Sequence, residues 1–411
     1  NYMEKFYKII LIALSLAICS GLFSQTNPSA KPKDFTSLPS VKWKFKAEQP
    51  FISSPVIDGN IVYAGNFDGN LYALDLKSGK IIWKFETDGD IRSTVTISEN
   101  KLYLTSGDGN LYALDKSNGT VIWKFAASDK KYDPYDYHQS SPVLYNNILY
   151  FGMGDGKVYA VNASDGKEVW SYQTGDVVHS TPAILKDKLY IGSFDGNVYG
   201  FNAADGNFLW KFKTVGHSYF PKGEVQFSPT AINITVYIAA RDYNLYAIDY
   251  EKGVCRWNRE FPAGWPTTVS YTPDRDSLII LGTSDPKHLY AIHRASEKTF
   301  WDLNLKSQVF GKCAYTENMI YIGTLIGKFH AIDINTGEIK WTFNTEGHNA
   351  NHLKYFTAED NYRDDILSIL KSDEEFVTAG YNCGAIYSTA AITNDEIIFS
   401  SADGTIYCLG R

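Results

Sequence analysis

The 411-residue sequence has no Cys-x-x-Cys pair and no two adjacent cysteines among its five. Their absence removes the common signatures of zinc and redox sites. Basic residues do not outnumber acidic ones, and the net charge of −7 argues against a nucleic-acid partner. Methionine is scarce, with 3 residues against 29 Tyr, 23 Phe and 9 Trp. Because aromatic side chains suit a pleated surface, this composition predicts a soluble all-β protein.

The N-terminal segment has the features of an export signal. Two lysines precede the apolar run Ile9 to Ile18, which is far shorter than the about 20 residues of a membrane-spanning helix. We interpret residues 1–25 as a signal peptide and expect no transmembrane segment in the mature chain. Cleavage near Ser24–Gln25 would give a soluble protein of the periplasm or cell envelope. The alternative is a lipoprotein anchored through Cys19, although bulky Ile18 stands where a small residue is expected.

A tryptophan recurs every 40 to 47 residues and marks an internal repeat. Each unit has four short apolar stretches separated by turn residues, and an Asp-Gly pair such as Asp68-Gly69 predicts a hairpin turn. Four antiparallel strands in about 40–45 residues are typical of a β-propeller blade. The eight repeat tryptophans are Trp43, Trp83, Trp123, Trp170, Trp210, Trp257, Trp301 and Trp341.

The number of repeats predicts an eight-bladed β-propeller over residues 41–411, after a signal peptide and a flexible linker over residues 26–40. The eighth unit ends at Arg411 before a fourth strand, and the segment Val41 to Ala47 supplies a spare one. We therefore expect the N-terminal strand to complete the last blade, which closes the ring and removes exposed sheet edges. The predicted first strands begin near Ser53, Ser93, Ser140, Ser180, Phe227, Thr267, Gly311 and Ser388.

The phrase Ala73-Leu74-Asp75, Gly79 and Trp83 resembles the tryptophan-docking motif of the quinoprotein, or PQQ-repeat, propellers. Blade six departs from it, with His293 in place of the Asp and no Gly before Trp301. The resemblance implies that the repeat tryptophans are structural and dock between blades. Within that family, the signal peptide, blade count and repeat phrase resemble the outer-membrane protein assembly factor BamB, a scaffold.

The same family includes PQQ-dependent dehydrogenases, which by resemblance hold the quinone between a tryptophan and a vicinal-cysteine disulfide and carry a calcium ion. This sequence has no vicinal cysteines, and it has no nucleophile elbow, P-loop or metal-binding His pair. We therefore predict no catalytic residues, no metal site and no cofactor. We interpret the four cysteines of the propeller as buried apolar side chains rather than disulfides, which leaves their thiol state open: Cys255, Cys313, Cys383 and Cys408.

A binding site is expected where the first strands begin, at one mouth of the propeller. Alignment of the blades places eight residues there: Ile52, Arg92, Gln139, His179, Gln226, Pro266, Phe310 and Tyr387. The longer links at this face add aromatic and imidazole side chains, which a rigid scaffold would present. The candidate ligand- or partner-binding residues are Arg92, Tyr135, His138, Gln139, His179, Gln226, Trp265 and Tyr387.

The longest link, residues 344–387, is predicted to contain a helix from Ala358 to Phe376 that begins after Thr357 and acts as a lid or a plug. The leading hypothesis is a monomeric, non-enzymatic scaffold that binds protein partners in the bacterial cell envelope. The alternative is a small-molecule or saccharide binding module, with a pocket walled by Trp265, Tyr135 and His179. A PQQ-dependent oxidoreductase is the third.

Overall fold

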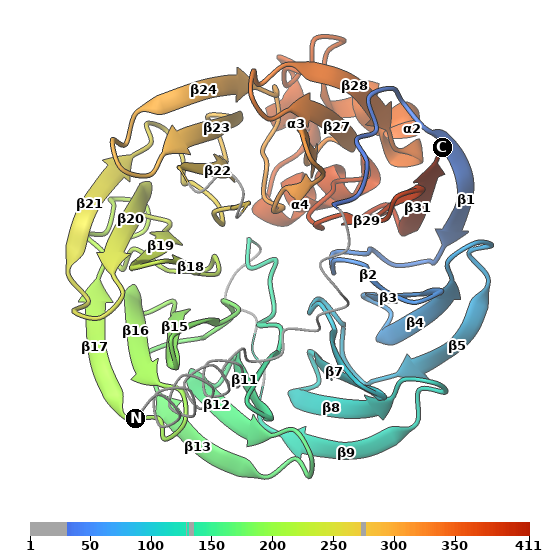
Figure 1. Ribbon diagram of the computed structural model, residues 1–411. Coiled ribbons are helices and arrows are strands. Elements are labelled where there is room, and N and C mark those ends of the chain that lie inside the picture. The colour runs from blue at the N-terminus through green and yellow to red at the C-terminus, as the bar shows by residue number, and fades with distance from the viewer. Residues whose placement is uncertain (1–30, 129, 131–134, 273–276) are drawn as a thin grey trace, which may run out of the picture.

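The computed structural model describes residues 31–128, 130, 135–272 and 277–411. The predicted signal peptide therefore lies outside the described residues. The strands form eight antiparallel sheets arranged in a ring (Figure 1), which confirms the predicted eight-bladed β-propeller. No helix among the described residues is long and apolar enough to span a membrane.

The first four blades each contain four strands in the order of the sequence. They are β2 (Val56–Asp58), β3 (Ile61–Gly65), β4 (Asn70–Asp75) and β5 (Ile81–Glu86); β6 (Thr96–Ser98), β7 (Lys101–Thr105), β8 (Asn110–Asp115) and β9 (Val121–Ala126); β10 (Val143–Tyr145), β11 (Ile148–Gly152), β12 (Lys157–Asn162) and β13 (Glu168–Gln173); β14 (Ala183–Leu185), β15 (Lys188–Gly192), β16 (Asn197–Asn202) and β17 (Phe208–Lys213).

The remaining blades follow the same plan, except that blade six has three strands and the last blade includes the N-terminal strand. They are β18 (Thr230–Ile232), β19 (Thr235–Ala239), β20 (Asn244–Asp249) and β21 (Cys255–Glu260); β22 (Leu278–Gly282), β23 (His288–His293) and β24 (Thr299–Asn304); β25 (Ala314–Tyr315), β26 (Met319–Gly323), β27 (Lys328–Asp333) and β28 (Ile339–Asn344); β29 (Ala391–Ile392), β30 (Glu396–Ser401) and β31 (Thr405–Gly410) with β1 (Ser40–Lys46). In blade six, the bridge between Ser270 and Ile280 stands where the other blades have a first strand.

Ring closure follows the prediction. β1 pairs antiparallel with β31, and Lys44 lies opposite Tyr407. The last blade is thus built from both ends of the propeller sequence. Figure 1 shows β1 in blue on the outer edge beside β31 in red.

Recurring polar residues satisfy backbone groups within each blade. The Ser53 hydroxyl donates to the carbonyl of Gly65 at 2.7 Å, which ties the beginning of the blade to its second strand. Asp68 accepts from the backbone N–H of Asn70 at 2.8 Å and from the Tyr72 hydroxyl at 2.6 Å. These contacts fix the hairpin turns, because an Asp side chain can cap its own turn.

The repeat tryptophans join neighbouring blades. Trp43 Nε1 donates to the carbonyl of Leu76 in the next blade at 2.8 Å, and its ring covers Gly79, whose φ is 68°. Blade six reproduces this turn without glycine, since Glu297 adopts a φ of 60°. Six further tryptophans donate the same bond to a carbonyl: Trp83, Trp123, Trp170, Trp210, Trp301 and Trp341.

The hydrophobic core is divided among the interfaces between blades. Tyr63 and Leu71 of the first blade pack with Leu102 and Leu114 of the second, and the cluster at the closure joins Trp43 of the last blade to Val62 of the first. Apolar side chains therefore hold each blade to its neighbours all around the ring.

The segment before β1 is partly built into the propeller. Phe35 is 2% exposed and accepts from Trp341 Nε1 through its carbonyl at 2.6 Å. Asp34 accepts from the backbone N–H of Asn318 at 2.9 Å, and this bond lowers the pKa of its carboxyl. The prediction of a flexible linker over residues 26–40 is wrong for Asp34 and Phe35, since Phe35 is buried between blades seven and eight and Asp34 bonds to Asn318.

The insertion over residues 344–387 contains three short helices beside blades seven and eight (Figure 1): α2 (Glu346–Tyr355), α3 (Ile366–Ile369) and α4 (Asp373–Asn382). The predicted helix from Ala358 to Phe376 is wrong. Asp360 has a φ of 65°, which an α-helix does not allow, and Phe356 and Tyr362 form an antiparallel bridge around it. The N-caps are instead Thr345 and Ser372.

The four cysteines of the described chain are free thiols. Cys313, Cys383 and Cys408 are buried, and burial raises the pKa of each to about 12. Cys255 is exposed. The expectation of four buried side chains is therefore wrong for Cys255, because its strand β21 lies on the outer edge of its blade, where apolar positions face solvent.

Candidate functional site

The chain itself fills the predicted mouth of the propeller. The eight residues that the sequence aligns there are all buried. Tyr137, from the link between β9 and β10, packs among them. Its ring centroid lies 4.7 Å from that of Tyr387 and 5.5 Å from that of Phe310. Burial raises the pKa of Tyr137 and Tyr387 well above the ordinary value for tyrosine, so both hydroxyls stay neutral.

Polar partners fix this link from below. Asp136 Oδ2 lies 2.7 Å from His179 Nδ1, and the Asp136 carbonyl accepts from Arg92 Nη1 at 2.8 Å. Gln139 Oε1 accepts from the backbone N–H of Arg92 at 3.1 Å. His138 lies in the same layer, where burial lowers its pKa to about 4. The hydrogen bonds of this layer are therefore all contacts within the chain.

Gln226 connects the same link to a buried arginine. Its Nε2 donates to the carbonyl of Tyr135 at 2.7 Å, and its Oε1 accepts from Arg241 Nη2 at 2.7 Å. Arg241 is fully buried, with its guanidinium 5.5 Å from the ring centroids of Phe220 and Trp265. A cation over aromatic faces is stabilised by the ring quadrupole. The guanidinium therefore supports the aromatic floor of the mouth.

Above this layer lies a cavity of about 510 Å³ between the links and the insertion. Its opening reaches the surface at Tyr219, whose side chain is 78% exposed. α4 supplies one wall through Phe376, Val377, Ala379 and Gly380. The aromatic residues that line the rest are Tyr135, Tyr137, Tyr219, Phe220, Tyr243, Trp265, Phe310, Phe356, Tyr362 and Tyr387.

Polar side chains also line this aromatic cavity, among them Ser284, Asp285, Gln308 and Asp373. Trp265 is 8% exposed, and its indole N–H has no hydrogen-bond partner among the residues that the structure describes. Asp285 lies on the lining, and burial raises the pKa of its carboxyl. Asp373 also lines the cavity and bonds to the Tyr135 hydroxyl. Because the charged groups among the described lining residues are carboxyls, the cavity favours a neutral or cationic guest.

The structure divides the predicted site residues into two sets. Tyr135, Trp265 and Tyr387 line the cavity, whereas Arg92, Gln139, Gln226 and His138 belong to the layer beneath it. The expected pocket wall of Trp265, Tyr135 and His179 is wrong for His179, because Asp136 holds that imidazole in the buried layer.

Two features of the insertion were not predicted from the sequence: the wall that α4 provides and a histidine pair in α2. Ser372 followed by three acidic residues, Asp373 to Glu375, is a helix-start signal that would have located α4. His348 and His352 are four residues apart, a spacing that places both on one face of a helix.

The fold and the mouth define a class: an eight-bladed propeller of tryptophan-docked repeats, with an aromatic cavity roofed by an insertion. Models of the family described as outer membrane protein assembly factor BamB match residues 40–176, 136–272 and 270–379. The chain belongs to this family. No curated protein matches the chain significantly.

Solved structures share the fold at low sequence identity. BamB from Moraxella catarrhalis is 16% identical with a TM-score of 0.65, and the match covers 91% of this chain and 98% of that one. The computationally designed Ika8 protein is 13% identical with a TM-score of 0.68, over 91% and 100%. Quinohemoprotein alcohol dehydrogenase ADHIIG from Pseudomonas putida HK5 is 12% identical with a TM-score of 0.66, over 93% and 78%. BamB, a designed protein and an alcohol dehydrogenase therefore all resemble this chain in fold.

The residues present do not fit a PQQ cofactor. The quinone carries several carboxylates, and cationic side chains would have to receive them. The described lining of the cavity instead offers Asp285 and Asp373, with no Lys or Arg. The sequence also has no adjacent cysteines that could form the vicinal disulfide expected by resemblance.

Proposed function

We propose that this protein is a non-enzymatic scaffold that binds partner proteins in the bacterial cell envelope. The observation that carries the proposal is the cavity at the mouth: it is aromatic, and the links and the insertion supply much of its lining. Such pockets receive the anchor side chain of a partner, and buried anchors dominate the energy of protein interfaces. The family supports this function, and the unsuitable lining argues against quinone chemistry.

The proposed site consists of the cavity rim and the residues that hold it. Tyr135, Trp265 and Tyr387 would contact the anchor directly. Five further residues would act indirectly, by fixing the link that carries Tyr135. They are Arg92, His138, Gln139, His179 and Gln226. Export to the envelope rests on the predicted signal peptide, with cleavage near Gln25 or lipidation of Cys19 as its two outcomes.

A variant that fills the cavity tests this proposal. A Cβ on Gly380 would lie 3.6 Å from the Leu325 carbonyl oxygen, an ordinary contact, so Gly380→Leu projects a side chain into the cavity without a backbone clash. Leu367→Gln is the matched control, since Leu367 is 75% exposed on α3 and does not line the cavity. Both variants would be expressed with the native leader in a bacterial envelope and purified for native mass spectrometry.

We expect a stoichiometric complex with an envelope protein in the wild type and in Leu367→Gln, and its loss in Gly380→Leu. A complex that persists in Gly380→Leu would show that partners bind elsewhere. The same spectra give the mass of the mature N-terminus, which distinguishes cleavage near Gln25 from a diacylated Cys19.

The alternative is a binding module for a small molecule or a saccharide. Its specific support is a pair of groups on the cavity lining, the Asp285 carboxyl and the Trp265 indole N–H that has no partner among the described residues, because sugar hydroxyls both accept and donate hydrogen bonds. A small-molecule mass adduct that is absent from Gly380→Leu would favour this function. For the third hypothesis, a PQQ-dependent oxidoreductase, added quinone and Ca²⁺ should yield no alcohol-dependent dye reduction.

A further inference from the structure

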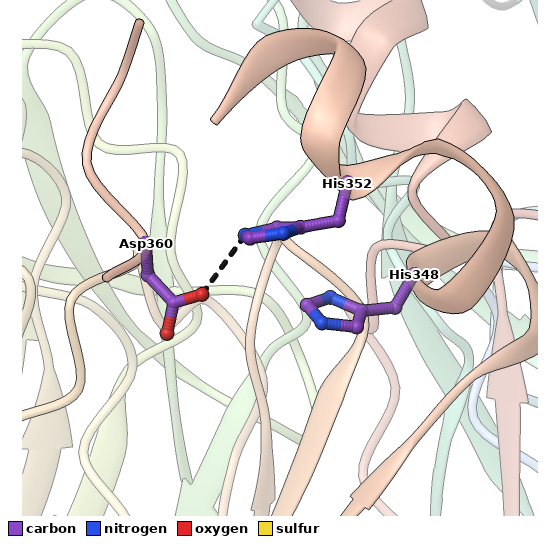
Figure 2. A group of neighbouring side chains, drawn as sticks. All are labelled: His348, His352 and Asp360. Carbon is purple, nitrogen blue, oxygen red and sulfur yellow. Dashed lines mark ion pairs between the residues drawn. The ribbon is translucent and has the colours of Figure 1, made fainter. Parts of the chain in front are cut away.

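Three ligand-type side chains meet in the insertion, behind the wall of the cavity. His348 and His352 project from α2, and Asp360 projects from the turn between Phe356 and Tyr362 (Figure 2). One nitrogen of each imidazole and one carboxylate oxygen all lie within 4.8 Å of one another. Within the part of the chain that the structure describes, this is the one group of its kind.

The surroundings orient His348 as they would a metal ligand. Its Nδ1 lies 2.5 Å from the carbonyl oxygen of Ile326 and donates to it. In the neutral ring the lone pair is then on Nε2, the nitrogen that would bind a metal. A backbone carbonyl on the second ring nitrogen is the outer contact typical of metal-bound histidines.

His352 and Asp360 supply the other two side chains of metal-ligand type. They are 7% and 8% exposed. His352 Nε2 and Asp360 Oδ1 lie 2.8 Å apart as an ion pair, and neither atom bonds to any other of the described residues. With a neutral imidazole whose lone pair is on Nε2, this nitrogen and Asp360 Oδ1 could share one partner, a cation. Asp360 Oδ2 is held by Lys328 Nζ, which leaves Oδ1 for that partner.

We infer that His348, His352 and Asp360 bind a divalent transition metal, with Zn²⁺ as the preferred ion. Two imidazoles and one carboxylate suit zinc, whereas Ca²⁺ and Mg²⁺ prefer oxygen ligands throughout. Ligands at about 2.1 Å in tetrahedral geometry lie about 3.4 Å apart, so small side-chain shifts would close the group around the ion. A water molecule would complete the coordination.

The ion would fix the wall of the cavity. Phe356 stacks on His352, with centroids 5.3 Å apart and an interplanar angle of 9°, and Phe356 lines the cavity. A metal that joins α2 to the turn at Asp360 would therefore hold Phe356 in place. The metal site does not depend on the scaffold function, since it concerns the insertion alone.

The test compares Zn²⁺ binding to the mature full-length chain and its variants after removal of metal with a chelator. Isothermal titration would measure affinity, thermal unfolding would measure stabilisation, and Co²⁺ would give visible d–d bands if the site is tetrahedral. The ligand variants are His348→Gln, His352→Gln and Asp360→Asn. His293→Gln on β23 is the matched control, because this histidine lies outside the group.

We expect one Zn²⁺ per chain, a higher melting temperature with Zn²⁺ but not with Ca²⁺, and at least about 100-fold weaker binding in each ligand variant. The estimate follows from outer-contact variants, which already lose about 10–100-fold. His293→Gln should bind as the wild type does.

Lys328→Met separates the metal site from a simple buried ion pair. If Asp360 serves only to pair with Lys328, this variant destabilises the protein and Zn²⁺ has no effect on it. In the metal site, Zn²⁺ compensates for the lost cation, so Lys328→Met keeps its affinity and is stabilised more than the wild type. Anomalous diffraction at the zinc edge from wild-type crystals needs no variant. Density away from the three side chains, absence of saturable binding, or equal binding in ligand variants and control would each overturn the inference.

Discussion

The contact between Trp43 and Gly79 is the place where ring closure can be tested energetically. Trp43 lies on β1, and Gly79 lies in the turn that follows β4. A Cβ on Gly79 would be 2.5 Å from Trp43 Cε3, and the residue has a φ of 68°. Gly79→Ala therefore combines backbone strain of about 1–2 kcal/mol with overpacking of about 1–3 kcal/mol. The expected loss in unfolding free energy is about 2–5 kcal/mol.

The two contributions separate in a double-mutant cycle measured by urea unfolding with circular dichroism. Trp43→Ala alone should cost about 3–5 kcal/mol, because it empties a buried site. Adding Gly79→Ala in that background should cost only the backbone strain, since the ring is gone. The coupling free energy is then about 1–3 kcal/mol. Such a value is typical of residues in direct contact.

The matched control is Gly119→Ala at the next interface, where φ is 74° and the Cβ would lie 2.6 Å from Trp83. Equal losses at the two positions are expected, because the closing interface uses the same contacts as an internal one. A coupling free energy near zero would refute the docking argument. A much smaller loss for Gly79→Ala than for Gly119→Ala would show that the closure is loose.

Three further predictions follow from individual side chains. Because burial lowers the pKa of His138 to about 4 from 6.5, the unfolded chain binds more protons in that range, and stability should fall as the pH drops from about 6.5 to 4. Between these two pH values, His138→Gln should lose about 2 kcal/mol less unfolding free energy than the wild type, allowing for the ring's partial exposure. Urea titrations that give the same pH profile for the variant and the wild type would contradict this prediction. A thiol reagent should label Cys255 rapidly in the folded chain and the three buried cysteines only after unfolding, counted by mass spectrometry; fast labelling of more than one of the four would disprove their burial. Thr345→Ala should cost about 1–2 kcal/mol, since Thr345 caps α2 and also donates to the Cys383 carbonyl, whereas Ser372→Ala at the more exposed cap of α4 should cost about 1 kcal/mol; equal thermal shifts for the two variants would contradict this difference.

The propeller could be predicted because its stabilising contacts repeat. Each unit carries the same residues at the same spacing, so eight copies of Trp, Gly and Asp reveal what one copy would not. The closure of the ring by the N-terminal strand could also be predicted, since the eighth unit lacks the strand that Val41 to Ala47 provides. The repeat also keeps Asp68 and Tyr72 four residues apart, and in the structure these two side chains form a hydrogen bond.

The mouth could not be predicted in the same way, because its residues occur once each. Alignment placed Arg92, His179 and Gln226 at equivalent positions, but it could not show that Asp136 and Tyr135 would bind them from a neighbouring link. Partners that are far apart in sequence and belong to no repeat leave no periodic signal.

The prediction of a helix in the insertion was wrong for a related reason. Apolar residues between Ala358 and Phe376 follow a helical spacing, but Asp360 is drawn to Lys328 and His352, and its positive φ breaks the helix there. Tertiary contacts overrode a local pattern, as they do where propensity is weak. The residue that broke the predicted helix is the same residue that completes the group of metal-ligand type.

This coincidence indicates how the molecule divides its tasks. Residues that repeat around the ring stabilise the blades: tryptophans pack between neighbouring blades, serines connect strands and aspartates cap turns. Residues that depart from the repeat gather at one mouth and in the insertion beside it. There the Trp265 N–H has no partner among the described residues, and Asp360 has a positive φ. Exceptions to local rules are expected at functional sites, because the rest of the fold must be stable enough to hold them. The rigid ring thus provides the support, and the insertion provides what is particular to this chain.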